Sequence, residues 1–462
     1  MGFPEIVTDP VSVIACALGL FIVVYGFFSL FVKERLYLSE TLVATVFGII
    51  IGPYALKFVN PHDWTTNTGE LTIQFARIVI AIQVMAAGVN LPKKYMQTEW
   101  VSMFIILGPV ILVMWFISAA FICLFFPLNY LESLVIGAAV APTDPVLANS
   151  IVQGKFAEKY LSHHVRNVLS AESGANDGLG FPYLALAILL LKPSTNVGSS
   201  IARWIYEVWL YQIILAVIIG VIIGWSARKI LRWSESKDFI DKENFLSFSI
   251  ALALFIMGFV KIIGANDFIA VFAAGNAFTW NDWYSDQSTD SHLQEIIDML
   301  FSISFFVYFG TTLQFSAFRE IGLGRLFAAS ACILVCRRLP IIMILWKWVP
   351  AIKNRREALF AGWFGPIGVG ALYYADEALK ELHHEDYEGN LTFDVVPVIE
   401  FIVFCSAVVH GVTVPVMKVG KHVNLTVTRT FSRGGSTRAN TNASGSRDRE
   451  EEEEKEEEEL LE

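Results

Sequence analysis

Two short segments of the sequence carry carboxylates in apolar surroundings, where charged side chains are rare. Thr143 and Asp144 stand between Pro142 and Pro145, inside a run of small apolar residues. Further along the chain, four oxygen-bearing side chains follow one another: Glu172, Ser173, Asn176 and Asp177. Carboxylate, hydroxyl and carbonyl oxygens bind small hard cations, and a carboxylate also takes up a proton. The two segments together predict a site for a proton and a small cation.

The second segment is expected to be helical. Residues four apart share a helix face, so Ser173 and Asp177 form one polar stripe. Glu172 and Asn176 form an adjacent stripe, about 100° around the helix. We expect Asp177 and Ser173 to offer oxygens to a cation, while Glu172 and Asn176 contact other protein groups. Two arginines further along the chain are candidate partners for Glu172: Arg337 and Arg338.

Proline and glycine interrupt two of the apolar runs. Pro142 and Pro145 remove amide donors and clash with preceding carbonyls, so a continuous helix cannot pass through them. Gly365 and Pro366 lie in a second stretch, 362–370, that is crowded with glycine. Interrupted helices at membrane depth are typical of the ion sites of secondary transporters. We therefore predict that both segments are broken and that they cross each other.

The elements that must position these side chains are membrane-spanning helices. Of the 462 residues, 55% are hydrophobic and 17% are charged, against about 45–50% and about 25% in soluble domains. A bilayer core needs about 20 mostly apolar residues per helix. Such runs centre near residues 21, 48, 80, 113, 142, 178, 216, 253, 273, 302, 334, 367 and 407. They predict an all-α polytopic membrane protein with about 13 transmembrane helices, of which the run near 273 is the weakest.

Loop charges set the predicted orientation, because Lys and Arg concentrate in cytoplasmic loops. One set of alternate connections holds sixteen of these residues and the other holds seven. Assigning the richer set to the cytoplasm places the N-terminus outside and the C-terminus inside. Spans 1–6 and 8–13 then form two inverted six-helix repeats, in which the broken helices 5 and 12 occupy corresponding positions.

The composition changes near residue 418. Residues 1–418 are predicted to form the transmembrane domain, and 419–462, ending in a run of Glu, to form a disordered acidic cytoplasmic tail. A net charge of −10 leaves no electrostatic footprint for nucleic acid. The five cysteines lie in apolar runs and indicate neither a disulfide framework nor a resident metal site.

Four segments resemble a known family. APTDPVLANSIV, LSAESGANDG, CRRLP and GWFGPIG are similar to segments of the fungal plasma-membrane sodium/proton antiporter family, within the monovalent cation/proton antiporter superfamily. The resemblance extends from the first span to about residue 418. It implies thirteen helices in two inverted repeats, interleaved as a dimerisation domain and a mobile core domain, in a homodimer at the plasma membrane.

The resemblance also implies roles for individual residues. Asp177 corresponds to the family's ion-binding aspartate. The rest of the implied Na⁺ site consists of Asp144, Thr143 and Ser173. The supporting positions are Glu172, Asn176, the span 11 arginine, which aligns best with Arg337, and Asp267.

The expected activity is secondary active antiport, not an enzymatic reaction. Cytoplasmic Na⁺, with Li⁺ and K⁺ as further candidates, would exchange for external H⁺ by alternating access. Cation and proton compete for Asp177 because desolvation disfavours a bare carboxylate charge. The transported ions are then the only ligands and no cofactor is expected. Roles in salt tolerance and in intracellular pH and cation homeostasis would follow.

Three other function classes stay open at this point. A cation channel also needs polar groups inside a bundle. An intramembrane aspartyl protease also places two carboxylates on neighbouring spans, but it requires a GxGD motif that this sequence lacks. A receptor or scaffold would use the acidic tail, and a Na⁺-dependent change of pH would separate a transporter from it.

Overall fold

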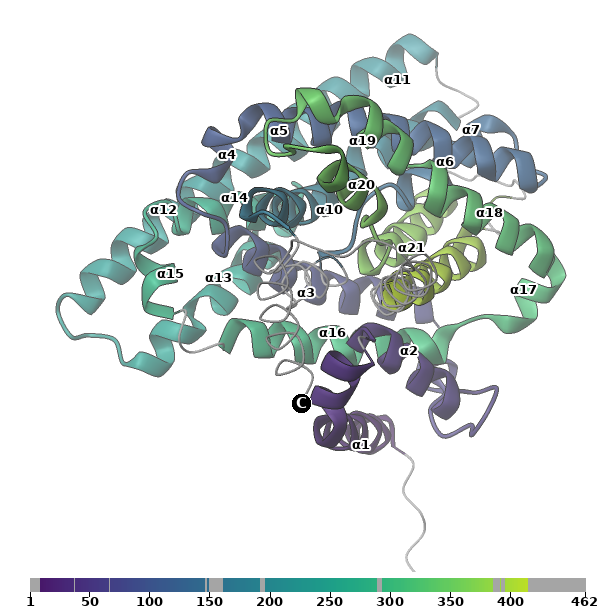
Figure 1. Cartoon of the computed structure of the whole chain (residues 1–462), viewed down its shortest axis with the longest axis horizontal. Helices are drawn as coiled ribbons and strands as arrows, with labels where there is room; N and C mark the ends of the chain where they lie inside the picture. Colours follow the sequence, from purple (N-terminus) through teal and green to yellow (C-terminus); the bar gives the residue numbers. More distant parts are fainter. Residues whose placement is uncertain are drawn as a thin grey trace, which may run out of the picture. The chain divides into compact units, whose positions relative to one another are not determined.

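A computed structural model of the chain describes residues 9–36, 38–65, 67–145, 148, 161–191, 196–288, 293–384, 391 and 395–413. Within these residues every regular element is a helix (Figure 1). They fall within one compact unit, Met1–Val414. The tail predicted for residues 419–462 lies outside the described residues.

The longest apolar helices are the candidates for membrane crossing. Nine stretches of the described chain have the length and composition to cross: Pro10–Lys33, Thr68–Val89, Trp100–Phe125, His163–Leu191, Val197–Glu235, Lys242–Ile263, Leu293–Thr312, Leu323–Trp348 and Val395–Thr413. Three further apolar helices have 10–17 residues: Glu40–Ile51, Tyr130–Ala139 and Asp267–Phe278.

Several of these stretches combine more than one helical element. In chain order the α-helices are α1 (Pro10–Leu30), α2 (Glu40–Ile51), α3 (Thr68–Val89), α4 (Tyr95–Thr98), α5 (Trp100–Ile105), α6 (Ile111–Phe125), α7 (Tyr130–Ala139), α10 (His163–Leu191), α11 (Val197–Arg203), α12 (Leu215–Glu235), α13 (Lys242–Ile263), α14 (Asp267–Phe278), α15 (Trp283–Ser288), α16 (Leu293–Thr312), α17 (Phe315–Ile321), α18 (Leu323–Cys336), α19 (Leu339–Leu345), α20 (Arg355–Trp363) and α21 (Val369–His384). Wide π-helical turns, Ile106–Val110 and Trp204–Ile214, join α5 to α6 and α11 to α12. The final helix, Val395–Thr413, carries no label.

Local side chains start several of these helices. The side chain of Asn67 accepts a hydrogen bond from the Glu70 amide at the start of α3. Asn129 and Glu132 form a reciprocal capping box at the start of α7. Asn266 caps α14 in the same way as Asn67 caps α3. Because the first amides of a helix have no partner within it, these polar residues fix where each helix begins.

Small residues allow α12 and α14 to pack backbone against backbone. A side chain at Gly220 would meet the Ala270 carbonyl, and one at Gly224 would meet the Ala274 carbonyl. The spacing of four on both helices aligns the small residues on facing stripes. This small-xxx-small pattern is typical of helix pairs in membranes, where close approach supplies the packing energy.

α2 packs against α16 in the same manner, with α1 beside them (Figure 1). A side chain at Gly48 would meet the Val307 carbonyl, and one at Gly310 would meet the Thr45 carbonyl. α3 contacts α16 and also both α10 and α21. α3 therefore connects the pair α2 and α16 to the helices that carry the predicted site.

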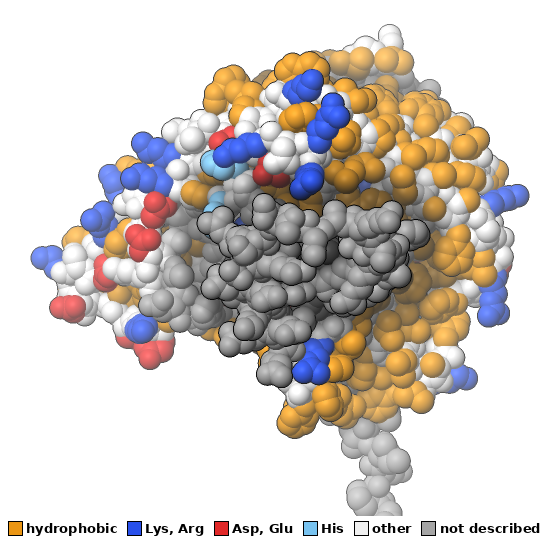
Figure 2. All heavy atoms as spheres, in the orientation of Figure 1, with side chains coloured by type: hydrophobic (Ala, Val, Ile, Leu, Met, Phe, Trp, Pro, Cys, Tyr) orange, Lys and Arg blue, Asp and Glu red, His pale blue; other side chains and the backbone are white. Residues whose placement is uncertain are grey.

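The outer surface is apolar, as a lipid-facing surface requires. Phe27 of α1 is 78% exposed and Ile262 of α13 is 86% exposed. Figure 2 shows hydrophobic side chains covering the face over α17 and α18, while Lys and Arg gather near α20 and near the ends of α12 and α13. Such exposed patches would be a liability in water, and their extent supports the membrane assignment.

The predicted fold class is confirmed, while the number of spans stays a prediction. The centres of the predicted apolar runs fall on helical residues except at the two predicted breaks, near 142 and near 367, where 140–144 and 364–368 are not helical. The weak run near 273 is the short and largely buried α14. Its 12 residues are fewer than a bilayer crossing needs, which explains its weak hydropathy signal.

Candidate functional site

The two predicted breaks are present, and they meet. α7 ends at Ala139, and 140–144 are not helical; α20 and α21 are separated by the non-helical residues 364–368. The Asp144 amide donates to the Pro366 carbonyl at 2.9 Å. In return, the Val369 amide donates to Asp144 Oδ2 at 2.8 Å. The crossing of the two broken helices is therefore confirmed.

The prolines and the glycine predicted to break the helices do not all lie in non-helical chain. Pro142, Gly365 and Pro366 lie in non-helical chain, whereas Pro145 is helical. The Ala148 amide donates to the Asp144 carbonyl at 3.1 Å, so Pro145 stands in the first turn of the next helix. Proline is tolerated there because that amide has no helical partner in any case. Pro145 thus restarts a helix and does not interrupt one.

Thr143, Ser173 and Asn176 form one buried hydrogen-bonded cluster. Asn176 Nδ2 donates to Thr143 Oγ1 at 2.8 Å, and the Thr143 amide donates to Asn176 Oδ1 at 3.2 Å. The hydroxyls of Thr143 and Ser173 are 3.1 Å apart. Asn176 thus contacts another protein group, as expected, and it holds the first break against α10.

Asp177 follows Asn176 directly in the chain, but its carboxylate takes no part in the hydrogen bonds of this cluster. The residue is 1% exposed, yet in the described part of the chain neither carboxylate oxygen has a hydrogen-bond partner. A Cβ at Gly370 would lie 2.5 Å from Asp177 Oδ1, so the glycine makes room for the carboxylate. The Tyr374 hydroxyl donates to the backbone carbonyl of Asp177 and fixes the main chain there. A carboxylate in such a position is stable only with a proton or a cation.

Both acidic side chains of the site face the same short stretch of chain at the start of α21. A Cβ at Gly368 would collide with the Asp144 carboxylate, and one at Gly370 would meet that of Asp177. Gly368 and Gly370 therefore let the start of α21 approach both carboxylates. Thr143 and Ser173 add hydroxyl oxygens beside them. All four residues of the predicted Na⁺ site are consequently brought together.

The partner of Glu172 is Arg338. The Arg338 guanidinium forms a two-pronged ion pair with Glu172, with Nη2 2.7 Å from Oε2. Its Nε also donates to the Ala361 carbonyl at 2.9 Å. Both residues are at most 2% exposed. The alternative left open by the sequence is thereby resolved, and Arg337 as the partner is excluded.

Arg337 has another role, which the sequence did not predict. Its guanidinium donates to the carbonyls of Val140, Ala141 and Gly365, with 3.2 Å to Ala141. These carbonyls belong to the two broken helices and have lost their helical partners. Arg337 therefore bridges the breaks and satisfies carbonyl groups that would otherwise stay unpaired.

Asp267 pairs with Arg77. Its Oδ2 accepts from Arg77 Nη2 at 2.9 Å and from Nε at 3.2 Å, and the residue is 3% exposed. The neighbouring Asn266 donates to the Gly178 carbonyl at 3.3 Å. Asp267 is thus a paired carboxylate at the start of α14, next to a contact with the ion-binding helix.

Two further residues of the last helix support the second break. Ser406 Oγ accepts from the Ile367 amide at 2.7 Å. The His410 ring contacts the Trp363 carbonyl at 3.2 Å and the Ser406 carbonyl at 3.0 Å. Sequence reasoning missed Ser406. Nothing in the pattern around Ser406 could have indicated this contact, because it depends on how the helices pack.

The donor set suits a small monovalent cation better than a tightly held metal. Among the described residues, no three His, Cys, Asp or Glu side chains come together in a metal-binding group. The site instead offers carboxylate and hydroxyl oxygens beside unwound backbone. Hard cations without strong geometric demands take oxygen ligands of this kind.

Comparison with known proteins places the chain in a family. Residues 19–419 match the family described as sodium/hydrogen exchanger, transmembrane. The chain is 41% identical over 427 residues to a probable Na⁺/H⁺ antiporter of Schizosaccharomyces pombe, covering 88% of this chain and 56% of that protein. It is 39% identical over 440 residues to a Na⁺/H⁺ antiporter of Saccharomyces cerevisiae, covering 90% and 44%. The chain thus spans about half the length of these two relatives.

Another relative agrees with this placement, and a solved structure has a similar fold. A second Schizosaccharomyces pombe Na⁺/H⁺ antiporter is 34% identical over 455 residues, with 94% of this chain and 96% of that protein covered. The sodium proton antiporter MjNhaP1 from Methanocaldococcus jannaschii has a similar fold, with a TM-score of 0.64 at 16% identity. The match covers 87% of this chain and 100% of that one. The chain therefore belongs to the transmembrane sodium/hydrogen exchanger family.

Proposed function

We propose that the chain exchanges Na⁺ for H⁺ across a membrane, with both ions bound in turn at Asp177. The observation that carries this proposal is the buried Asp177 carboxylate, which has no protein partner in the described chain. Gly370 leaves room beside this carboxylate, and Ser173, one helical turn away, offers a hydroxyl oxygen for a small cation. The three relatives are all named as Na⁺/H⁺ antiporters, which supports Na⁺ and H⁺ as the two exchanged ions.

The mechanism rests on the cost of a bare charge in this position. An uncompensated carboxylate at membrane depth costs several kcal/mol, on the order of 2.5–3.5 even on the mildest scale. Either ligand removes that cost, so the loaded forms can pass the membrane barrier and the empty form cannot. Because one carboxylate holds either Na⁺ or H⁺, the two fluxes are coupled by mutual exclusion. Asp144, Thr143 and Ser173 add oxygens to the cation in this scheme.

Direction and location are further parts of the proposal. The bias of Lys and Arg between alternate loops supports an outside N-terminus and a cytoplasmic C-terminus. Protons flowing inward would then expel cytoplasmic Na⁺ or Li⁺ at the plasma membrane, with salt tolerance and pH homeostasis as the consequence. A homodimer, in which one domain of each copy is held fixed while the core moves, is expected from the family resemblance.

The test is ion exchange by the purified protein in proteoliposomes. An imposed Na⁺ gradient should change the lumenal pH, and the change should saturate with Na⁺ and reverse with the gradient. Asp177→Asn should abolish it. Asp286→Asn, which alters an exposed carboxylate on α15, is the matched control and should leave exchange intact. Na⁺-driven pH change that survives in Asp177→Asn would contradict the proposal, and conductance without saturation would indicate a channel.

A further inference from the structure

A second group of buried polar side chains lies where α3 packs against α16. Gln294, Asp298 and Ser302 are each four residues apart on α16, so they share one face of that helix. Gln83 of α3 reaches this face, because its Nε2 donates to Ser302 Oγ at 3.2 Å. Gln83 is 1% exposed and Ser302 is 2% exposed. We call these four residues the Asp298 cluster.

Three buried polar atoms of the Asp298 cluster have no hydrogen-bond partner among the described residues: Asp298 Oδ1, Gln83 Oε1 and Gln294 Nε2. Ser302 Oγ, by contrast, donates to the Asp298 carbonyl at 2.6 Å, and Gln294 Oε1 accepts from Ser249 Oγ at 3.1 Å. An unpaired buried polar atom costs about 1–3 kcal/mol. Two of the three unpaired atoms are oxygens on facing helices, so one positively charged ligand between them would satisfy both.

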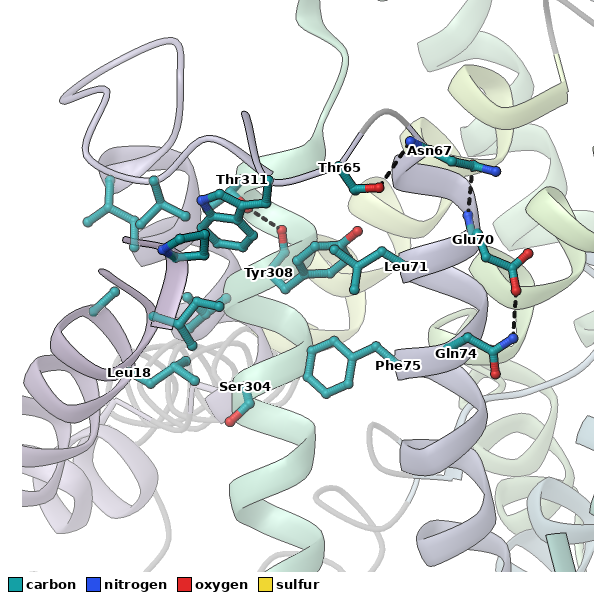
Figure 3. Close-up of a pocket in the computed structure, with 17 residues that line it drawn as sticks. Leu18, Thr65, Asn67, Glu70, Leu71, Gln74, Phe75, Ser304, Tyr308 and Thr311 are labelled. Atoms are coloured by element: carbon teal, nitrogen blue, oxygen red, sulfur yellow. Dashed lines mark hydrogen bonds between the residues drawn. The ribbon is translucent and has the colours of Figure 1, made fainter. Parts of the chain in front are cut away.

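The face of α16 toward α1 is different. An open apolar pocket of about 670 Å³ lies there, and Figure 3 shows Ser304, Tyr308 and Thr311 along its α16 wall. All three hydroxyls have partners: Ser304 donates to the Leu300 carbonyl at 2.7 Å, Tyr308 bonds Thr72 at 2.8 Å, and Thr311 donates to the Tyr308 carbonyl at 2.7 Å. Because successive residues turn by about 100° around a helix, these positions lie on a different face from the Asp298 cluster. The missing partners are therefore a feature of the cluster and not of α16 as a whole.

Acidic side chains act on the Asp298 carboxylate. The charged groups that act on it most strongly are Asp144, Glu40 and Glu295. Asp144 belongs to the predicted Na⁺ site, and Glu40, at the start of α2, pairs with Lys33. In the predicted orientation α2 and α16 both begin at the cytoplasmic side. The cluster therefore lies in a negative potential, which attracts cations, and within electrostatic reach of the Na⁺ site.

The oxygen atoms of the cluster suit a weakly held monovalent cation. Asp298 supplies a carboxylate, Gln83 an amide carbonyl and Ser302 a hydroxyl, and all three groups are ligands for hard cations. Only one of them is charged, and Asp298 is partly exposed, so a bound cation would keep part of its water shell. A divalent ion needs more charge than this, and among the described residues no group of three His, Cys, Asp or Glu side chains could hold one.

We propose that Asp298, Gln83 and Ser302 form a second Na⁺ site, which the cation occupies transiently between the cytoplasm and Asp177. This inference rests on the proposed exchange function and adds a binding step to it. The second site is weaker than the first, because it has one partly exposed carboxylate where the first has two buried ones. It is therefore largely empty at Na⁺ concentrations that saturate Asp177, and the competition at Asp177 is unchanged.

The first test measures Na⁺-driven exchange in proteoliposomes over a range of Na⁺ concentrations. Asp298→Asn removes the charge that brings Na⁺ to Asp177. The half-saturating Na⁺ concentration should rise by about three- to tenfold, as expected for lost electrostatic focusing, while the maximal rate stays close to that of the native protein. Gln83→Leu should act in the same direction without a change of charge. Glu320→Gln is the matched control, because it removes an exposed carboxylate on α17 and should leave the half-saturating concentration unchanged.

The second test detects the site without transport, so its result holds even if the chain exchanges no ions. A ligand that binds the folded protein raises its unfolding temperature. High Na⁺ should therefore stabilise Asp177→Asn in detergent, relative to choline at the same ionic strength. Combining Asp177→Asn with Asp298→Asn should reduce this stabilisation. Equal stabilisation of the single and the double variant would overturn the proposal.

Asp298→Asn also distinguishes a cation from a proton at this site. If Asp298 only carries a proton that it donates to Gln83 Oε1, the asparagine amide replaces that donor. Exchange with the native Na⁺ dependence in Asp298→Asn would then overturn the proposal. A lower maximal rate at an unchanged half-saturating concentration, in both Asp298→Asn and Gln83→Leu, would overturn it as well and would assign the cluster to helix packing.

Discussion

Glu172 and Asp177 are two carboxylates five residues apart on the same helix, and both are buried. Glu172 is held by both prongs of the Arg338 guanidinium. Asp177 has no hydrogen-bond partner for either oxygen within the described residues. A side chain that is fully paired stabilises one arrangement of the helices. A side chain that is buried and unpaired requires a ligand from outside the protein, and that requirement is what a transport site needs.

The largest effect on stability is expected from removing the charge of Glu172. Glu172→Gln leaves the Arg338 guanidinium buried without its counter-ion, which costs about 3–5 kcal/mol. The variant should unfold at a clearly lower temperature or fail to accumulate in the membrane. Asp177→Asn loses no hydrogen bond and removes an unpaired charge, so its unfolding temperature should equal or exceed that of the native protein. Thermal unfolding in detergent compares the two variants. Equal destabilisation of both would contradict the distinction between a paired structural carboxylate at Glu172 and an unpaired one at Asp177.

The next effect concerns the space in front of Asp177. Gly370→Ala places a methyl group against Asp177 Oδ1, where a cation would have to bind. Na⁺-driven exchange should fall by at least tenfold, which corresponds to about 1.4 kcal/mol, while the Glu172 pair stays intact and stability changes little. Gly258→Ala on α13 is the matched control, because its Cβ would meet nothing within 4 Å. Exchange that is equally fast in Gly370→Ala would show that the cation binds elsewhere.

A smaller effect on exchange is expected from Arg337→Lys. Lysine keeps the charge but presents one ammonium, whereas the guanidinium reaches carbonyls on both broken helices. Losing one or two of these hydrogen bonds should destabilise the protein by about 1–3 kcal/mol and slow exchange with little change in apparent Na⁺ affinity. Exchange rates measured at several Na⁺ concentrations would separate the maximal rate from the apparent Na⁺ affinity. A pure loss of affinity would instead place Arg337 among the ion ligands.

The smallest effect is expected at an exposed carboxylate, which provides the baseline for the comparison. Asp241 caps α13, and its hydrogen bonds with Asn244 lower the pKa of the Asp241 carboxyl below its usual value. A lowered pKa means that this contribution to stability is complete above the unfolded pKa, about 4, and is lost as the pH falls through the folded value. Asp241→Asn should match the native protein in thermal unfolding at pH 7, since asparagine caps equally well. Only below about pH 4 should the native protein lose relative stability.

Hydropathy and helix-breaking residues were enough to predict most of the fold. The long spans arise from the requirement that backbone groups be satisfied within the bilayer, and the breaks arise from Pro142, Gly365 and Pro366. The number of spans was harder to predict, because α7 and α14 are too short to cross a bilayer by themselves. Local caps fix where they begin, Asn129 for α7 and Asn266 for α14, but a hydropathy count that assumes full-length spans does not show that they end early.

The residues of the site were predicted from the sequence, but some of their contacts were not. The spacing along α10 correctly placed Asp177 and Glu172 on different stripes of the helix, because helix geometry fixes which residues share a face. The choice between Arg337 and Arg338 could not be made, since adjacent residues point in different directions and the bend between α18 and α19 decides which one reaches Glu172. Ser406 was missed because its contact with Ile367 joins residues far apart in the chain.

The central claim is that Asp177 binds a proton or a cation but never both. Proton release on Na⁺ binding measures this directly: Na⁺ is mixed with the protein in weakly buffered detergent solution, at a pH where the site is protonated, and the pH change is recorded. The account predicts release of about one proton per bound Na⁺, and none from Asp177→Asn. Na⁺ binding without proton release, or the same release from Asp177→Asn, would contradict it.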